Sequence, residues 1–208
     1  MIKIYADGAD LSSIKSLRDR VGGFTTNPSL VRAAGVSDYQ AFAVSALALA
    51  GDKPVSIEVL SDDFTEMERE ARAIASWGAN AVVKIPVTNS LGAFTGPVID
   101  LLTCDGIKIN VTAIMTFGQV SAVLDCIRCR GVILSIFAGR VADTGHDPER
   151  LIRVSSDAAH YRNALVLWAS TREIFNVVQA ERCGADIITV TPDMLIKTDG
   201  FGRDLDTY

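Results

Sequence analysis

The sequence predicts a single (β/α)8 barrel that occupies residues 1–208. Segments typical of strands alternate with segments typical of helices along the whole chain, and this alternation gives parallel βαβ units. Eight such units can be placed, in a length near the lower limit of these barrels, about 200 residues. No linker or low-complexity stretch divides the chain, so we expect one domain.

A doubly wound open sheet is the alternative arrangement of the same elements. Its dinucleotide-binding version carries a G-x-G-x-x-G motif directly after the first strand. No such motif follows residues 2–6. The number of units and the missing motif therefore favour the closed barrel.

The strands are predicted from short apolar and β-branched runs that end at turn residues. The first run, Ile2 to Ala6, ends at Asp7. The fourth reads Ala-Val-Val-Lys-Ile-Pro and carries a single charge, at Lys84. In order, we expect strands at 2–6, 23–25, 54–60, 81–86, 107–113, 132–137, 164–169 and 187–190.

The helices are predicted from apolar residues at helical spacing and from capping residues. Asp10 is a suitable N-cap for the first helix, Asn27 precedes a proline at the first helical position, and Thr116 with Gln119 forms a capping box. Gly78 and Gly184 follow two helices as C′ residues. In order, we expect helices at 11–20, 29–34, 38–50, 63–77, 91–102, 116–130, 148–161 and 172–183, and the start of another at 193; the segment 91–102 is only weakly helical because it contains two glycines and a proline.

Composition excludes several classes of protein. The formal charge is −5 and no run of lysines or arginines is present, so we expect no nucleic-acid partner. The N-terminal residues lack the apolar core of a signal peptide, and no apolar run is long enough to span a membrane. We therefore expect a cytoplasmic protein without a membrane partner.

The four cysteines favour free thiols. Cys126 and Cys129 have C-x-x-C spacing, but they lie in a helical pattern and no second pair follows at zinc-site spacing. Metal binding or redox chemistry is the alternative interpretation. We expect reduced cysteines, no metal and no cofactor.

Lys84 is the most informative residue, because a lysine inside a strand buried on both faces requires a reason. Desolvation favours the neutral amine of a lysine, which can attack a carbonyl and form a Schiff base. The ordinary alternative is that Lys84 lies at the strand end and pairs with a carboxylate. The hexapeptide alone does not decide between them.

Polar residues at the ends of seven consecutive strands strengthen the catalytic interpretation, because the active site of a parallel barrel lies at the carboxyl ends of its strands. Single residues have ordinary explanations: Asn27 and Ser170 as helix caps, Glu58 as a rim charge. Together they suit Schiff-base chemistry on a phosphorylated carbonyl compound. The residues are Asp7, Thr25, Thr26, Asn27, Glu58, Lys84, Thr88, Asn110, Thr112, Ser135, Phe137, Arg140, Ser170 and Arg172.

Five stretches, in this order along most of the chain, resemble the short single-domain transaldolase family, which includes the fructose-6-phosphate aldolases. They are Thr25-Thr-Asn-Pro-Ser29, Val83-Lys-Ile-Pro86, Asn110-Val-Thr112, Phe137-Ala-Gly-Arg140 and Ser170-Thr-Arg172. The first two together are a specific signal. The resemblance implies a (β/α)8 barrel with class I aldolase chemistry on sugar phosphates, without cofactor or metal, in carbohydrate metabolism.

The resemblance also implies roles for individual residues. Lys84 would form the Schiff base with a ketose, and Asp7 would be the acid and base at the C4 hydroxyl. Glu58 and Thr112 would hold a proton-relaying water. Asn27 and Asn110, with Ser135 beside them, would bind hydroxyls of the three-carbon fragment, and Arg140 and Arg172, with Ser170, would bind the phosphate. Thr25 and Phe137 complete the substrate-binding set.

Glu58 and Phe137 favour the transferase branch, because the aldolase branch tends to have glutamine and tyrosine at these positions. A transaldolase would move a dihydroxyacetone unit from fructose 6-phosphate or sedoheptulose 7-phosphate to an aldose phosphate. The alternatives are a lyase that releases free dihydroxyacetone, an enzyme for a longer-chain sugar phosphate, and a barrel that binds a sugar phosphate without turnover.

Three features depart from the family pattern. Asp7-Gly8-Ala9 replaces the usual Asp-Thr-Ala, and Ser135-Ile136-Phe137 replaces Ser-Pro-Phe. Short members usually have a further C-terminal helix that packs on a neighbouring subunit, whereas this sequence stops at Tyr208. We expect a homo-oligomer, but the usual ring-like decamer does not follow from the sequence.

Overall fold

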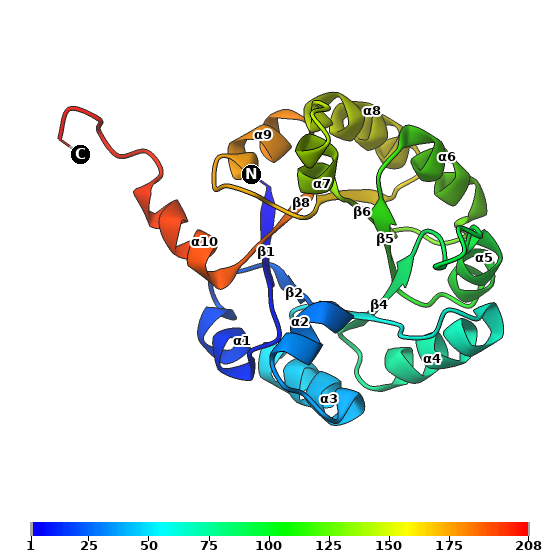
Figure 1. Cartoon of the computed structure of the whole chain (residues 1–208). Helices are drawn as coiled ribbons and strands as arrows, with labels where there is room; N and C mark the ends of the chain where they lie inside the picture. Colours follow the sequence, from blue (N-terminus) through cyan, green and yellow to red (C-terminus); the bar gives the residue numbers. More distant parts are fainter. Residues whose placement is uncertain (1, 208) are drawn as a thin grey trace.

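The structure, a computed structural model that describes residues 2–207, is a closed barrel of eight parallel strands inside a ring of helices (Figure 1). Each strand pairs with the next one in sequence, and the last pairs with the first. The predicted barrel is confirmed, and the open sheet is excluded. The strands are β1 (Lys3–Asp7), β2 (Gly23–Thr25), β3 (Val55–Glu58), β4 (Ala81–Pro86), β5 (Ile109–Ile114), β6 (Ile133–Ile136), β7 (Leu165–Trp168) and β8 (Ile187–Val190).

The helices lie outside the strands, and the chain after β8 extends away from the barrel (Figure 1). The predicted caps are confirmed: the side chains of Asp10, Asn27 and Thr116 accept backbone N–H groups, and Gln119 completes its capping box. The helices are α1 (Leu11–Leu17), α2 (Pro28–Ala33), α3 (Tyr39–Ala50), α4 (Phe64–Ser76), α5 (Gly96–Cys104), α6 (Phe117–Cys126), α7 (Ala138–Asp143), α8 (Pro148–Tyr161), α9 (Asn176–Arg182), α10 (Pro192–Lys197) and the 3-10 helix η1 (Thr198–Gly200).

Several predicted helix boundaries are wrong, and side-chain hydrogen bonds explain one of them. The expected helix 91–102 begins only at Gly96, because Asn89 Oδ1 accepts the N–H groups of Leu91 and Ala93 and holds that stretch in a turn. The expected helix 116–130 ends at Cys126, since Ile127 is extended. Side-chain hydrogen bonds of this kind compete with the helical pattern.

Three further predictions need correction. Helix α1 ends at Leu17 rather than at residue 20. Helix α7 was not predicted, because Phe137 at its N-cap makes no capping hydrogen bond and so gives no start signal in the sequence. Gly78 and Gly184 each follow the C-cap of a helix as predicted, but of the two only Gly184 has the left-handed φ, 79°, that this position favours.

The apolar core of the barrel has two layers. One layer fills the space between strands and helices, and a second, smaller cluster fills the barrel interior. The second contains Tyr5, Val82, Ile133, Leu167 and Ile187. These side chains fill the barrel below the carboxyl ends of the strands, the end at which the active site of such a barrel lies.

Candidate active site

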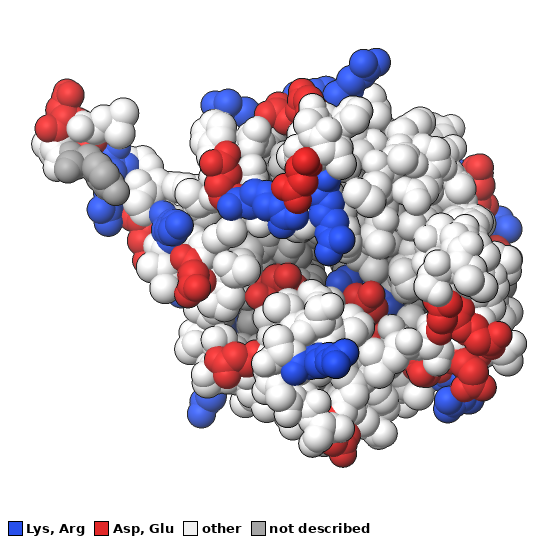
Figure 2. Space-filling model, viewed as in Figure 1, with Lys and Arg blue, Asp and Glu red and all other residues white. Residues whose placement is uncertain are grey.

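A cavity of about 520 Å³ lies at the carboxyl ends of the strands. Figure 2 shows it as a hollow in the middle of this face, with Lys and Arg side chains gathered beside it over α7 and α9. Ten of the twelve predicted site residues line it: Asp7, Thr25, Asn27, Glu58, Lys84, Thr112, Ser135, Phe137, Arg140 and Ser170. Asn110 and Arg172 do not line it.

Lys84 lies at the floor of the cavity and is only 6% exposed. Its Nζ is 3.0 Å from Glu58 Oε2 and donates a hydrogen bond of 3.1 Å to the carbonyl of Thr26. Lys84 is paired with Glu58 in the β3–β4 register, so neighbouring strands bring the two charges together. A carboxylate at this distance can accept a proton from the amine.

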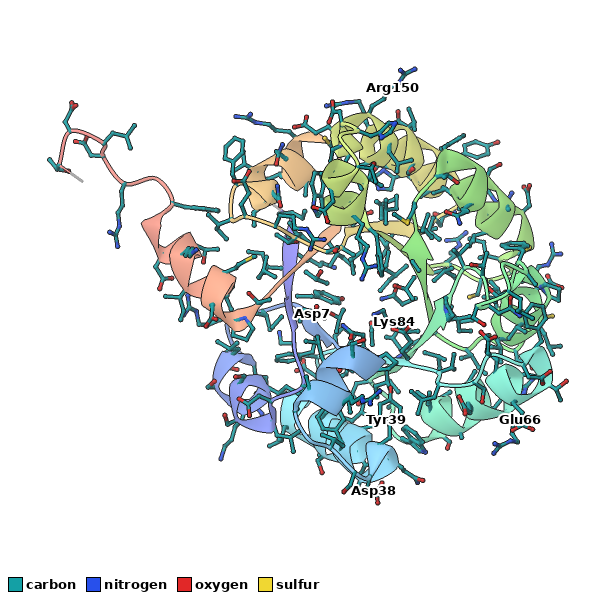
Figure 3. The ribbon with its side chains drawn as sticks, in the orientation of Figure 1. Asp7, Asp38, Tyr39, Glu66, Lys84 and Arg150 are labelled. Atoms are coloured by element: carbon teal, nitrogen blue, oxygen red, sulfur yellow. The ribbon has the colours of Figure 1, made fainter. Side chains whose placement is uncertain are left out.

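Asp7 enters the same cavity from β1 and points, with Lys84, toward the barrel axis (Figure 3). Its Oδ1 accepts a hydrogen bond of 2.6 Å from Thr25 Oγ1. Burial raises the pKa of Asp7 above its ordinary value, and the Thr25 hydrogen bond and the charge of Lys84 offset only part of that rise. A carboxyl group of this kind is suited to exchange protons with substrate.

Asn110 and Ser135 form a buried polar pair next to the cavity. Ser135 Oγ donates to Asn110 Oδ1 at 2.7 Å, and Asn110 Nδ2 donates to Ser56 Oγ at 3.1 Å. Asn110 is fully buried and adjoins Lys84 in the β4–β5 register. In this structure Asn110 therefore supports Ser135, which itself reaches the cavity.

Thr112 presents a polar atom that has no partner among residues 2–207. Its Oγ1 is buried without a hydrogen bond, and the residue lines the cavity. A register shift in the β5–β6 pairing follows Val111, and Ala113 there has a φ of 59°. Bulges and positive φ values cluster near active sites, where they redirect side chains. Here the irregularity brings both Thr112 and Ala113 to the cavity wall.

Asn27 combines a structural contact with a place on the cavity wall. Its Oδ1 caps α2 by accepting the N–H of Leu30 at 3.0 Å, as its propensity predicts. Its amide nitrogen is not part of that cap. Asn27 can therefore fix the start of α2 and still offer a donor to a ligand.

Arg140 and Phe137 form the wall of the cavity near α7. The guanidinium carbon of Arg140 lies 5.4 Å from the centre of the Phe137 ring, in cation–π geometry. Phe137 directly precedes α7, so the start of this short helix sets both side chains. The arrangement leaves a fixed positive charge at the mouth.

Ser170 and Arg172 follow β7. Ser170 lines the cavity with a φ of 63° and does not cap a helix. The guanidinium of Arg172 lies outside the cavity wall, paired with Asp143 on α7 at 2.5 Å. The sequence placed Arg172 at the site, and the structure places it at the outer rim beside Arg140's helix.

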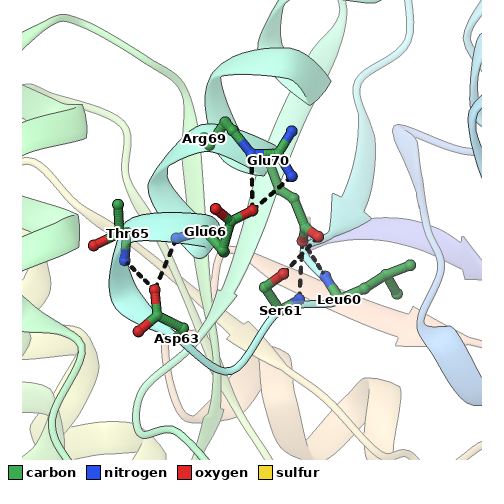
Figure 4. A network of polar contacts seen from close by, with 7 residues as sticks. All are labelled: Leu60, Ser61, Asp63, Thr65, Glu66, Arg69 and Glu70. Carbon is green, nitrogen blue, oxygen red and sulfur yellow. Dashed lines mark hydrogen bonds and ion pairs between the residues drawn. The ribbon is translucent and has the colours of Figure 1, made fainter.

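The loop after β3 is fixed around Glu58. Tyr39 Oη donates to the Glu58 carbonyl at 2.7 Å, and Glu70 accepts hydrogen bonds from the N–H groups of Leu60 and Ser61 and from the Ser61 hydroxyl (Figure 4). Burial raises the pKa of Tyr39, so its hydroxyl stays protonated and donating.

Sequence reasoning missed several lining residues: Pro28, Ser29, Leu30, Ala113, Leu167, Ala169 and Thr189. Thr189 had a usable signal, because it alternates with Ile187, which faces the barrel interior. Leu167 and Ala169 had none, since apolar residues in a strand give no sign of facing a cavity.

Residues 2–207 also bear on metal binding and on membrane insertion. Those residues contain no group of three or more His, Cys, Asp or Glu side chains that could hold a metal ion, and all four cysteines are free. Within the same residues, no helix has the length and apolar character needed to cross a membrane.

Residues 4–204 match the family model described as Transaldolase/Fructose-6-phosphate aldolase. The chain belongs to this family. It is therefore an enzyme of the class I aldolase type, and the resemblance seen in the sequence is confirmed.

Relatives from bacteria and archaea agree with the family model. A probable transaldolase of Roseiflexus castenholzii is 39% identical over 90% of this chain and 85% of its own length. A probable transaldolase of Dehalococcoides mccartyi is 35% identical over 94% and 89%, and one of Nitrosopumilus maritimus is 34% identical over 94% and 86%. The matches extend through nearly the whole barrel.

Among solved structures, dihydrodipicolinate synthase from Rhodopseudomonas palustris superposes with a TM-score of 0.63 at 19% identity. The match covers 95% of this chain and 73% of that one. At this identity the likeness supports the fold alone.

Proposed function

We propose that this enzyme is a transaldolase that moves a dihydroxyacetone unit from a ketose phosphate to an aldose phosphate through a Schiff base on Lys84. The observation that carries the proposal is the buried ammonium of Lys84, 3.0 Å from Glu58, at the floor of an open cavity. A buried amine beside a proton acceptor is the arrangement that a carbonyl-attacking lysine requires.

In the first half of the reaction, Lys84 loses a proton to Glu58 and its Nζ attacks C2 of the ketose. The carbinolamine then loses water, with Glu58 and the unpartnered Thr112 hydroxyl holding the water that relays protons. Asp7 takes the proton of the C4 hydroxyl, and the bond between C3 and C4 breaks. An aldose phosphate leaves, and a three-carbon enamine stays on Lys84.

In the second half, the enamine carbon attacks the aldehyde of an acceptor. Asp7 returns its proton to the new hydroxyl, and water releases the longer ketose from Lys84. The raised pKa of Asp7 supports this exchange, because a carboxyl that holds its proton more tightly can both accept and return it.

The remaining predicted residues would bind substrate. Ser135, supported by Asn110, and the amide of Asn27 would contact hydroxyls of the three-carbon fragment, and Thr25 would orient Asp7. Arg140 and Ser170 line the cavity at the end where α7 begins, and Arg172 lies beyond them. Guanidinium groups there suit a phosphate.

Borohydride trapping with fructose 6-phosphate, followed by intact-mass measurement and peptide mapping, tests the proposal. We expect a reduced adduct on Lys84. If no adduct forms with fructose 6-phosphate or with sedoheptulose 7-phosphate, the Schiff-base reaction on these donors is refuted.

A lyase that releases free dihydroxyacetone is the second candidate. Glu58 and Phe137 at the cavity argue for the transferase, since the aldolase branch tends to have glutamine and tyrosine there. Product analysis with and without an acceptor aldehyde separates the two. We expect little free dihydroxyacetone when no acceptor is present.

We further propose that the enzyme is a cytoplasmic homo-oligomer. The four free thiols are typical of a reducing compartment. The chain after β8, which extends from the barrel in Figure 1, exposes Ile196, Phe201 and Leu205. Apolar side chains gathered on one projecting segment are typical of an interface.

A further inference from the structure

Three residues outside the cavity, Gly139, Asp143 and Asn176, hold Arg172 at its rim. Gly139, the second residue of α7, lies directly against the loop after β7. A Cβ atom at position 139 would lie 1.7 Å from the carbonyl oxygen of Ser170 and 3.2 Å from Cγ of Arg172. The bare backbone of Gly139 therefore brings the helix of Arg140 and the loop of Arg172 into contact.

Asp143 holds the side chain of Arg172. It lies one turn after Arg140 on α7, and its carboxylate accepts hydrogen bonds from Arg172 Nε at 3.1 Å and from Nη2 at 2.5 Å. The hydrogen bond from Arg172 is the main cause that holds the pKa of Asp143 below its ordinary value, and the charges of Arg172 and Arg140 add to this effect. One carboxylate therefore lowers the repulsion between two guanidinium groups.

This ion pair contributes little to stability. The side chains of Arg172 and Asp143 are 46% and 53% exposed, and exposed pairs are weak because solvent screens them. The hydrogen bonds to Asp143 use one edge of the guanidinium, formed by Nε and Nη2. Because these hydrogen bonds fix the orientation of the guanidinium, its other edge, which includes Nη1, is free of Asp143 and can donate to an anion.

Asn176 holds the backbone of Arg172. Its Oδ1 accepts the N–H groups of Arg172 at 2.9 Å and of Glu173 at 3.1 Å. Its Nδ2 donates to Gln179 at 2.7 Å, and Gln179 donates to Glu149 on α8 at 2.9 Å. Asn176 is 9% exposed, so this chain of hydrogen bonds connects the Arg172 loop to two helices through the protein interior.

We propose that Asp143 and Asn176 are positioning residues for phosphate recognition: Asp143 orients the guanidinium of Arg172 and Asn176 fixes its backbone, so that Arg172 and Arg140 act together on the substrate phosphate. This inference rests on the proposed function. Neither residue touches the reacting atoms, so both act on the phosphate through Arg172.

The test compares wild type, Asp143→Asn and Asn176→Ala in steady-state kinetics with fructose 6-phosphate, with inorganic phosphate as inhibitor. We expect each variant to raise KM and the inhibition constant of phosphate roughly ten-fold, the value of one charge-assisted hydrogen bond. We expect kcat to change by less than about three-fold, because the contacts at the phosphate act mainly on binding.

Three controls separate positioning from general damage. Asp105→Asn removes a carboxylate of similar exposure that pairs with Arg72 on α4, and its KM should match wild type. Asn176→Asp keeps the acceptor for the two N–H groups and should restore KM. Borohydride trapping of dihydroxyacetone, which has no phosphate, should proceed at the wild-type rate in every variant.

The outcomes distinguish this inference from the proposed function. If wild type forms no adduct with dihydroxyacetone or fructose 6-phosphate, the proposed function fails. If wild type reacts but phosphate inhibits the two variants as strongly as wild type, the positioning role is refuted. A lower KM in Asp143→Asn would also overturn it, because the carboxylate would then compete with phosphate.

Discussion

Lys84 has two roles to separate at the scale of a single residue, because its side chain pairs with Glu58 and, once its amine has given up a proton, can attack a carbonyl. Lys84→Arg separates the two. Arginine keeps the charge next to Glu58, but its guanidinium cannot be deprotonated in proteins and forms no Schiff base.

We therefore expect Lys84→Arg and Lys84→Ala to lose activity by at least about 10⁴-fold, since they abolish covalent catalysis. Kinetics and borohydride trapping measure the loss, and circular dichroism controls for folding. A folded Lys84→Arg variant with appreciable turnover would contradict the Schiff-base role.

Asp7 links activity to stability. Because folding raises its pKa, the native state holds the proton more tightly than the unfolded chain. The free energy of unfolding therefore falls as pH rises from the ordinary value of 3.8 through the raised pKa. Asp7→Asn removes the destabilisation that comes from burying an ionised carboxylate, and it keeps an acceptor for the Thr25 hydroxyl. We expect a higher melting temperature near neutral pH, no gain in strong acid, and a loss of activity of about 10²-fold or more.

The pKa of Asp10 shifts in the opposite direction to that of Asp7, so Asp10 serves as the control. Hydrogen bonds from Ser12 and Ser13 lower the pKa of its exposed carboxyl to about 2. The stability that this carboxyl contributes is fully present at pH values above its ordinary pKa of 3.8 and is lost as the pH falls through about 2. Asp10→Asn should lower the melting temperature near neutral pH and leave activity unchanged. Equal pH profiles for the two variants would refute the assignment for Asp7.

At the scale of elements, the contact between α7 and the loop after β7 depends on a missing Cβ. Gly139→Ala would place a methyl group 1.7 Å from a backbone oxygen, which cannot move as a side-chain end can. We expect the free energy of unfolding, measured in urea, to fall by about 2 kcal/mol or more, as at other overpacked sites.

Gly118→Ala is a matched control, because Gly118 is also the second residue of its helix and its nearest neighbour is the Thr116 hydroxyl at 3.9 Å. Alanine there should stabilise by up to about 1 kcal/mol. If Gly139→Ala and Gly118→Ala gave the same change, the packing of α7 on this loop would be excluded as the cause.

At the scale of the whole molecule, the segment after β8 controls assembly in our proposal. Phe201 and Leu205 are 46% and 87% exposed on a part of the chain that extends from the barrel. We expect Phe201→Ser with Leu205→Ser to shift sedimentation toward the monomer without changing the circular dichroism spectrum. A wild-type monomer at micromolar concentration would contradict the proposal.

The sequence by itself determined the barrel and most of the cavity wall. Strand and helix periods are local, and a closed parallel barrel directs every strand end to one face. Asp7, Glu58, Lys84 and Ser135 could therefore be assigned to a common site before any contact was known.

Only the tertiary structure decided the contacts between separate elements. The positive φ of Ala113 within β5, the burial of Asn110 beside the cavity, and the pairing of Arg172 with Asp143 on α7 depend on atoms that are distant in sequence. Helix α7 itself was missed because it lacks a side-chain N-cap, which is the local signal that marked other short helices. Periodicity records which face of an element is buried, whereas the partner on that face is chosen by packing of the whole chain.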